Sequence, residues 1–307
     1  MRSLLLLLVG LCLPLFAHAE YSRTYLESHP LQMAKVRELD IAYRIVAPGP
    51  DKPKAVVIMG LGGSNVAWGD ALISGLADGG YELLLLDNRD TGASTRFDEW
   101  GQPVLWWELL KYQFGFSVNA PYTLNDMGAD IAGLMEVTGY GNAHIIGASM
   151  GGMIAQVVAA QYPEKTRSLI SIMSTTNAPH LPPPTEEAEM NLRNLATGEA
   201  QNEREQTIRD RGFYPESMQR HLMAIFKTGD RSEEVATITA PTLVLHGADD
   251  GLVPPEHGEH TASLIAGSRF LLIEGMAHNM PEDVIPLLVS EMTAHMDRAE
   301  ARAVATR

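Results

Sequence analysis

Cysteine is almost missing from the sequence: its 307 residues contain a single one, Cys12. That residue lies in an N-terminal segment that we expect to be removed, so the remaining chain would have no thiol. The mature chain would then have no disulfide, no thiolate metal site and no cysteine nucleophile. Its stability must come from its hydrophobic core, which a chain of this length can supply.

Basic residues are also scarce. The chain has 23 Lys and Arg against 38 Asp and Glu, a net charge of -15, and it contains no basic run and no alternation of basic with aromatic residues. Such a surface repels nucleic acid and anionic lipid. We therefore expect no nucleic-acid partner.

Long hydrophobic runs are limited to the first residues. The apolar run from Leu4 to Phe16 has 13 residues, fewer than the roughly 20 that span a bilayer. Arg2 precedes this run and Ala17-His18-Ala19 follows it. A basic start, a short apolar stretch and a small-x-small end are typical of a secretory signal peptide.

We predict that residues 1–19 are a signal peptide and that residues 20–307 form one mature domain. The protein would be exported, to the periplasm or beyond the cell, with no stable membrane insertion after cleavage. The alternative is an uncleaved membrane anchor, and N-terminal sequencing that began at Met1 would support it.

Short apolar runs alternate with segments of helical spacing along the rest of the chain. The expected strands are 35–47 (an edge pair), 55–59, 81–86, 143–146, 168–173, 242–246 and 269–273, and the expected helices are 66–78, 124–138, 150–162, 256–264 and 284–296, with a frayed tail from Arg298. Parallel strands need helical crossovers. The pattern predicts an α/β fold with a doubly wound, mostly parallel sheet and helices on both faces.

One interval, residues 175–237, breaks this alternation. It contains three consecutive prolines, a charged helical stretch, and apolar residues at 218, 222 and 225 that must pack against something. We expect a helical cap over one edge of the sheet. The alternative is a pair of surface helices without a functional role.

The segment Gly147-Ala148-Ser149-Met150-Gly151 follows an expected strand and opens an expected helix. This is the context of a nucleophile elbow, in which a strained turn lifts the serine hydroxyl above the sheet. Side chains at 147 and 151 would collide with the neighbouring helix and strand. Ser149 is therefore the candidate nucleophile.

A serine hydroxyl needs an adjacent base. Of the ten histidines, His278 follows the last expected strand and Gly275, on the edge of the sheet that carries Ser149. We therefore predict that His278 is the base. His246 is expected to bond locally, while His257 and His260 are expected to be solvated on a helix.

The base needs an acid that fixes its tautomer. Two aspartates, Asp249 and Asp250, follow the expected strand at 242–246, which gives the chain order serine, acid, histidine. An oxyanion hole needs two backbone N–H donors. Met150, after the nucleophile, is one candidate. The other lies in the glycine loop after the strand at 55–59, where Leu61 is preferred and Gly62 is the alternative.

With these motifs in order, the chain from about Lys35 to the last helix resembles the α/β-hydrolase superfamily. In related sequences the acid lies in Gly-x-x-Asp with a proline four residues on, which selects Asp250 with Pro254. The segment from Asp87 to Thr95 is similar to a subgroup of serine esterases that includes the aclacinomycin methylesterase type and bacterial LipG-like hydrolases.

This sequence departs from the family pattern in two places. The oxyanion loop, which commonly begins His-Gly, begins Met59-Gly60, and Asp90 stands where glycine is more common. We expect Arg89 and Asp90 to brace their loop, with a substrate-facing role as the alternative.

The resemblance implies a serine hydrolase that cleaves a small-molecule carboxylic ester through an acyl-enzyme on Ser149, without a cofactor or a metal. Other acyl chemistry on the same residues stays open: thioester or lactone hydrolysis, acyl transfer, perhydrolysis or carbon–carbon bond hydrolysis. A ligand-binding protein built on a hydrolase scaffold is the rival from another class.

Overall fold

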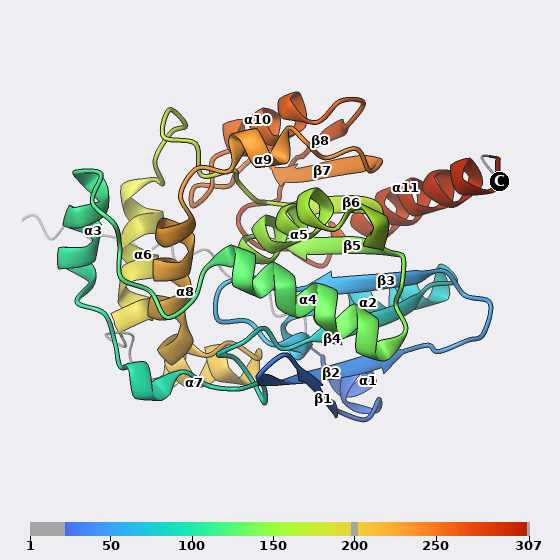
Figure 1. Ribbon diagram of the computed structural model, residues 1–307, viewed down its shortest axis with the longest axis horizontal. Helices are drawn as coiled ribbons and strands as arrows, with labels where there is room; N and C mark the ends of the chain where they lie inside the picture. The colour runs from blue at the N-terminus through green and yellow to red at the C-terminus, as the bar shows by residue number, and fades with distance from the viewer. Residues whose placement is uncertain (1–21, 198–201, 306–307) are drawn as a thin grey trace, which may run out of the picture.

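The computed structural model describes residues 22–197 and 202–305. The expected signal peptide lies outside these residues. One sheet forms the centre of the molecule, with strands in the order β1-β2-β4-β3-β5-β6-β7-β8 (Figure 1). They are β1 (Gln32–Val36), β2 (Leu39–Val46), β3 (Lys54–Ile58), β4 (Glu82–Leu86), β5 (Ala143–Ala148), β6 (Thr166–Ile172), β7 (Thr242–Gly247) and β8 (Arg269–Ile273).

The pairing of these strands agrees with the expected α/β fold. The pairs β1–β2 and β2–β4 are antiparallel, and every other neighbouring pair is parallel. The central strands consist of buried residues on both faces, as a sheet covered by helices requires.

The helices are α1 (Thr24–Glu27), α2 (Asp70–Asp78), α3 (Leu105–Gln113), α4 (Leu124–Thr138), α5 (Met150–Gln161), α6 (Glu186–Thr197), α7 (Asn202–Asp210), α8 (Pro215–Thr228), α9 (Ser232–Val235), α10 (Glu256–Leu264) and α11 (Ile285–Ala305). Short 3-10 turns lie at Asn65–Trp68, Asp98–Trp100 and Pro163–Lys165.

Two hydrophobic clusters lie on opposite faces of the sheet. Residues of α2 and α11 pack with Ala55 and Val57 of β3 on one face, whereas residues of α4 and α5 pack with Val56 and Ile58 on the other. Figure 1 shows α4 and α5 in front of the sheet and α2 behind it. Because side chains alternate along a strand, each central strand contributes to both clusters.

Three expectations about helices were wrong. The helix expected over 66–78 is divided by Gly69, whose φ of 70° ends a 3-10 turn before α2 begins. The last helix does not fray at Arg298 but continues to Ala305, and Ala299 is still buried there. Helix α3 was not among the expected helices. Its apolar side chains Trp106 and Trp107 are largely exposed, so no buried stripe marks it.

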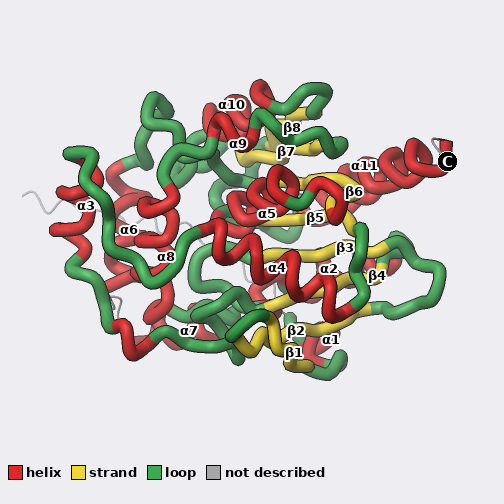
Figure 2. Tube along the Cα trace, in the orientation of Figure 1, coloured by secondary structure: helices red, strands yellow, loops and turns green. Residues whose placement is uncertain are grey.

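The interval 175–237 contains α6, α7, α8 and α9. Helix α8 packs against α3, α4 and α6, and Figure 1 shows α3, α6, α7 and α8 grouped beyond one end of the sheet. Figure 2 shows only helices and loops in this part of the molecule. No helix among residues 22–197 and 202–305 is long and apolar enough to cross a membrane.

Candidate active site

Ser149 occupies a strained turn between β5 and α5. Its φ of 55° and ψ of -123° lie outside the regions that non-glycine residues favour. The turn is held by Ser149 N–H, which donates to Ile172 O at 2.9 Å, and by Ser174 Oγ, which donates to Ser149 O at 2.8 Å. This is the strand–turn–helix geometry that the sequence predicted.

The glycines that flank the serine are sterically required. A Cβ on Gly147 would lie 2.1 Å from Gly151 O in α5, and a Cβ on Gly151 would lie 2.0 Å from Ile58 O in β3. Both contacts are with backbone atoms, which cannot move aside cheaply. The predicted collisions with the neighbouring helix and strand are therefore confirmed.

The structure brings the three predicted side chains into consecutive hydrogen-bond contact. His278 Nε2 lies 2.9 Å from Ser149 Oγ, and His278 Nδ1 lies 2.8 Å from Asp250 Oδ2. The loops that carry Asp250 and His278 are joined by the N–H of Asp249, which donates to Met276 O at 3.0 Å. The carboxyl ends of β5, β7 and β8 thus deliver the three residues to one edge of the sheet.

Asp250 is buried, with 3% of its surface exposed, and its carboxylate is well bonded. Its Oδ1 accepts from the N–H groups of Leu252 and Val253 at 3.0 and 2.9 Å. Burial alone would raise the pKa of this carboxyl. The contacts from His246 and His278 and the Val253 N–H outweigh burial, so the pKa of Asp250 is well below its usual range.

The ionised carboxylate fixes the tautomer of His278. A carboxylate can only accept hydrogen bonds, so Nδ1 must carry the proton and donate it to Asp250. The lone pair on Nε2 then faces the hydroxyl of Ser149, which can donate its proton to the ring. Asp249, the alternative acid, is exposed and lies outside this chain of contacts.

His246 bonds locally, as expected. Its Nε2 lies 2.7 Å from Val253 O and 3.5 Å from Asp250 Oδ2, so it supports the acid loop. The expectation that His257 is solvated was wrong. Its ring lies between Thr175 Oγ1 at 2.6 Å and Pro182 O at 2.9 Å, and therefore ties α10 to the segment after β6.

The backbone N–H groups of Leu61 and Met150 lie near Ser149 and have no hydrogen-bond partner among the described residues. Met150 is the first residue of α5, where an N–H has no acceptor within the helix. The glycine loop approaches it closely, because a Cβ on Gly60 would lie 3.4 Å from Met150 N. The N–H of Gly62, the alternative donor, is already bonded to His221 Nδ1 at 3.1 Å.

Comparison with known proteins identifies the family to which this fold belongs. The sequence profile of the α/β hydrolase fold matches residues 56–213, half of the chain. The chain belongs to the α/β hydrolase family.

Among curated proteins, this α/β hydrolase is 24% identical to rhodomycin D methylesterase DauP from Streptomyces sp. (strain C5), over 80% of the chain and 93% of the relative. It is 25% identical to a 2-hydroxy-6-oxononadienedioate/2-hydroxy-6-oxononatrienedioate hydrolase from Burkholderia vietnamiensis, over 72% of the chain and 78% of the relative. A solved esterase from Thermogutta terrifontis matches with a TM-score of 0.62 and 20% identity, over 88% of this chain and 99% of the other. The resemblance to the methylesterase group is confirmed.

The segment after β4 braces the site of this α/β hydrolase. Arg89 forms two contacts with Asp130 of α4, at 2.6 and 2.7 Å. Asp90 is fully buried and is paired with Arg220 of α8. These two residues therefore hold the loop, as predicted.

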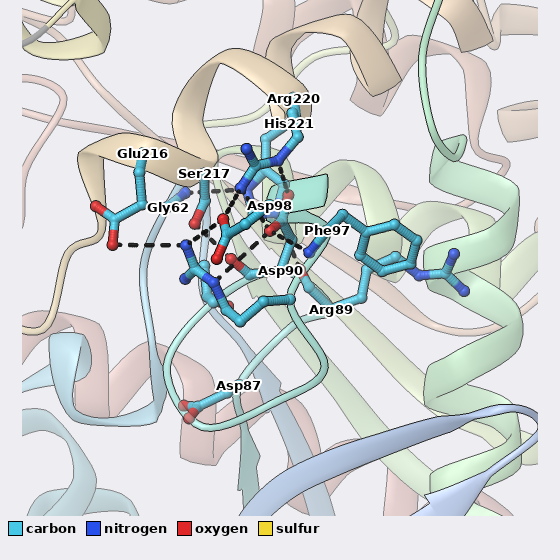
Figure 3. A network of polar contacts seen from close by, with 12 residues as sticks. Gly62, Asp87, Arg89, Asp90, Phe97, Asp98, Glu216, Ser217, Arg220 and His221 are labelled. Carbon is cyan, nitrogen blue, oxygen red and sulfur yellow. Dashed lines mark hydrogen bonds and ion pairs between the residues drawn. The ribbon is translucent and has the colours of Figure 1, made fainter. Parts of the chain in front are cut away.

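Sequence reasoning missed Arg220 and His221. Both are buried on α8: His221 contacts the loops after β3 and β4, and Arg220 contacts the loop after β4 (Figure 3). The available signal was an adjacent Arg-His pair on a helix whose apolar residues were already expected to be buried. A buried arginine needs an acid, and Asp90 stands where glycine is more common in the family.

Proposed function

We propose that this α/β hydrolase cleaves a carboxylic ester through an acyl-enzyme on Ser149. The observation that carries the proposal is the continuous chain from Ser149 Oγ through His278 to the ionised Asp250. Beside it lie the N–H groups of Leu61 and Met150, which have no partner within the described part of the chain. In a protein that only binds a ligand, such a chain would have no use.

The first step forms the acyl-enzyme. Ser149 Oγ attacks the ester carbonyl carbon while its proton passes to His278 Nε2. The carbonyl oxygen becomes an oxyanion, which accepts hydrogen bonds from the N–H groups of Leu61 and Met150. The intermediate collapses with cleavage of the bond to the alcohol oxygen, and the leaving alcohol takes the proton from His278.

The second step releases the acid. His278 takes a proton from a water molecule, whose oxygen attacks the acyl carbonyl. The second oxyanion occupies the same site, and its collapse breaks the bond to Ser149 Oγ, which recovers its proton from His278. Throughout, Asp250 stays ionised and stabilises the imidazolium.

Product analysis tests the reaction class. The mature protein is offered p-nitrophenyl butyrate, a methyl ester, a p-nitrophenyl carbamate and a dienoate carbon–carbon substrate. We expect both esters to be turned over. With p-nitrophenyl butyrate, a burst of p-nitrophenol equal to one per active site is expected when deacylation limits the rate. Turnover of the carbamate or the dienoate alone would replace ester hydrolysis by that chemistry.

We also propose that the protein is exported after cleavage at Ala19, on the sequence pattern of residues 1–19. N-terminal sequencing of the protein from the culture medium and from the periplasm tests this. The expected first residue is Glu20, and a chain that starts at Met1 would contradict the proposal.

A further inference from the structure

His221 links the insertion to the glycine loop of the site. It lies on α8 and is fully buried. Its Nδ1 lies 3.1 Å from Gly62 N, and its Nε2 lies 3.1 Å from Arg89 O. Figure 3 shows His221 and Arg220 on α8 directed towards the loop that carries Arg89 and Asp90.

The two partners fix the protonation of the ring. The N–H of Gly62 can only donate, so Nδ1 must carry a lone pair. The carbonyl of Arg89 can only accept, so Nε2 must carry the proton. Burial lowers the pKa of His221 to about 4, so the ring is neutral in neutral solution, as this arrangement requires.

The bond to Gly62 acts on the residue beside it. Gly62 N–H belongs to the peptide plane that joins Leu61 to Gly62, so holding this N–H fixes the ψ of Leu61. Gly62 has a φ of 65°, and three of the four residues from 60 to 63 are glycines. Because glycine allows many backbone conformations, the loop needs external contacts to keep one.

The segment before α8 supplies further contacts to the same loop. Tyr214 N–H donates to Gly62 O at 2.7 Å, and Ser64 N–H donates to Gly212 O at 2.9 Å. These contacts set the distance of the loop from the insertion. The imidazole of His221 is the side chain that bonds the peptide next to Leu61 N–H.

Helix α8 is itself anchored beside His221. Arg220 Nε and Nη2 reach the two oxygens of Asp90 at 2.6 and 2.8 Å, and Ser217 Oγ donates to Asp90 O. The ring is therefore held by a helix that is fixed to the loop after β4. Through its bond to Gly62, the ring restrains the loop after β3.

We propose that His221 is a positioning residue for the oxyanion hole: as a neutral Nδ1 acceptor it holds the Leu61–Gly62 peptide so that Leu61 N–H points at the oxyanion. This inference rests on the proposed function. It assigns a role in the reaction to a side chain of the insertion that does not touch the substrate.

Two substitutions separate the two bonds of the ring. In His221→Asn, Oδ1 lies where Nδ1 was and still accepts from Gly62 N–H, but the donor to Arg89 O is lost. In His221→Gln, the amide reaches towards Arg89 O, but the acceptor for Gly62 is lost. Both are amides, so their polarity is matched.

The assay is steady-state hydrolysis of p-nitrophenyl butyrate, with active sites counted by titration with a fluorophosphonate. We expect His221→Gln to lower kcat by about 10- to 100-fold with KM changed less than about threefold, because the oxyanion contact is made only in the transition state. The affinity for an aliphatic trifluoromethyl ketone, whose adduct carries the oxyanion, should fall by a similar factor. His221→Asn should stay within about fivefold of the parent in both measurements.

His144→Gln is the control, because His144 is also fully buried but lies at the start of β5, at the end opposite to Ser149, where it is bonded to Ser168 of β6. It should lower thermal stability and leave kcat per titrated site unchanged. Equal kcat for the Asn and Gln variants, or a loss in His144→Gln as large as in His221→Gln, would overturn the positioning role. A folded parent protein that the fluorophosphonate does not label would instead refute the proposed function.

Discussion

Replacing Arg220 by methionine should destabilise the fold more than most single substitutions. Asp90 is fully buried, and four donors surround its carboxylate: Arg220 through Nε and Nη2, Tyr122 OH at 2.8 Å and Phe97 N–H at 3.1 Å. Methionine fills a similar volume but removes two of these donors and the nearer of two positive charges, since Arg96 Nε lies 3.9 Å from Asp90 Oδ1. Breaking one side of a buried ion pair costs about 3–5 kcal/mol.

The partner substitution should cost less. In Asp90→Asn the shape of the side chain is kept and asparagine tolerates the φ of 72° at this position. Arg220 would still contact Asp98 at 2.8 Å and Gly101 O at 3.2 Å. We expect a loss of about 2 kcal/mol, in the range for a charged group that loses part of its bonding.

The double variant tests whether the two side chains act as a pair. Asp90→Asn removes the charge that Arg220→Met leaves with only the more distant Arg96, 3.9 Å away, as its cation. The double variant should therefore be more stable than the sum of the single losses by about 1–3 kcal/mol. Guanidinium denaturation, followed by both circular dichroism and tryptophan fluorescence, gives the free energies. Strictly additive losses, or a loss below about 1 kcal/mol for Arg220→Met, would refute the reasoning.

Three further predictions concern the elbow, the acid and the pH dependence of stability. Gly147→Ala should lower the free energy of unfolding by more than about 4 kcal/mol or prevent folding, because the added Cβ would lie 2.1 Å from a backbone atom. Gly141→Ala, with open space around it, should cost less than about 1 kcal/mol. Similar melting temperatures for the two variants would contradict this. Asp250→Asn should lower kcat by about 10³- to 10⁴-fold at neutral pH, because His278 loses the carboxylate that fixes its tautomer. Asp249→Asn should leave ester turnover unchanged, and equal losses in the two variants would contradict the assignment of the acid. Burial lowers the pKa of His295 to about 4, below the unfolded value near 6.5. Between these two values the unfolded chain binds a proton at His295 that the folded protein does not. The contribution of His295 to the free energy of unfolding is therefore fully present above pH 6.5 and is lost as the pH falls towards 4. His295→Gln should therefore reduce the slope of unfolding free energy against pH by about 1 kcal/mol per unit between pH 5 and 6, and parallel slopes in denaturant titrations would contradict it.

The parts of the site that sequence could predict are those with local causes. Ser149 is marked by two glycines that its turn requires, and His278 by its place directly after the last strand. The choice of Asp250 over Asp249 came from the family pattern. The structure supports that choice through burial and bonding, because Asp250 faces His278 while Asp249 is exposed.

His221 could not be predicted because its function depends on a contact between residues 159 positions apart. The apolar spacing of α8 predicted a buried face, but it does not say which loop that face meets. The sequence has Met59 where related oxyanion loops begin with histidine, and the structure brings a histidine to this loop from α8. Helix α3 could not be predicted because its large apolar residues lie on the surface and form no buried face.

Labelling with a fluorescent fluorophosphonate tests the assignment of Ser149, His278 and Asp250 most directly. The parent protein is compared with Ser149→Ala, His278→Ala, Asp250→Asn and Asp249→Asn, each shown to be folded by circular dichroism. We expect labelling to disappear in Ser149→Ala, to fall sharply in His278→Ala and Asp250→Asn, and to be unchanged in Asp249→Asn. A folded parent that is not labelled, or labelling that survives Ser149→Ala, would contradict the account.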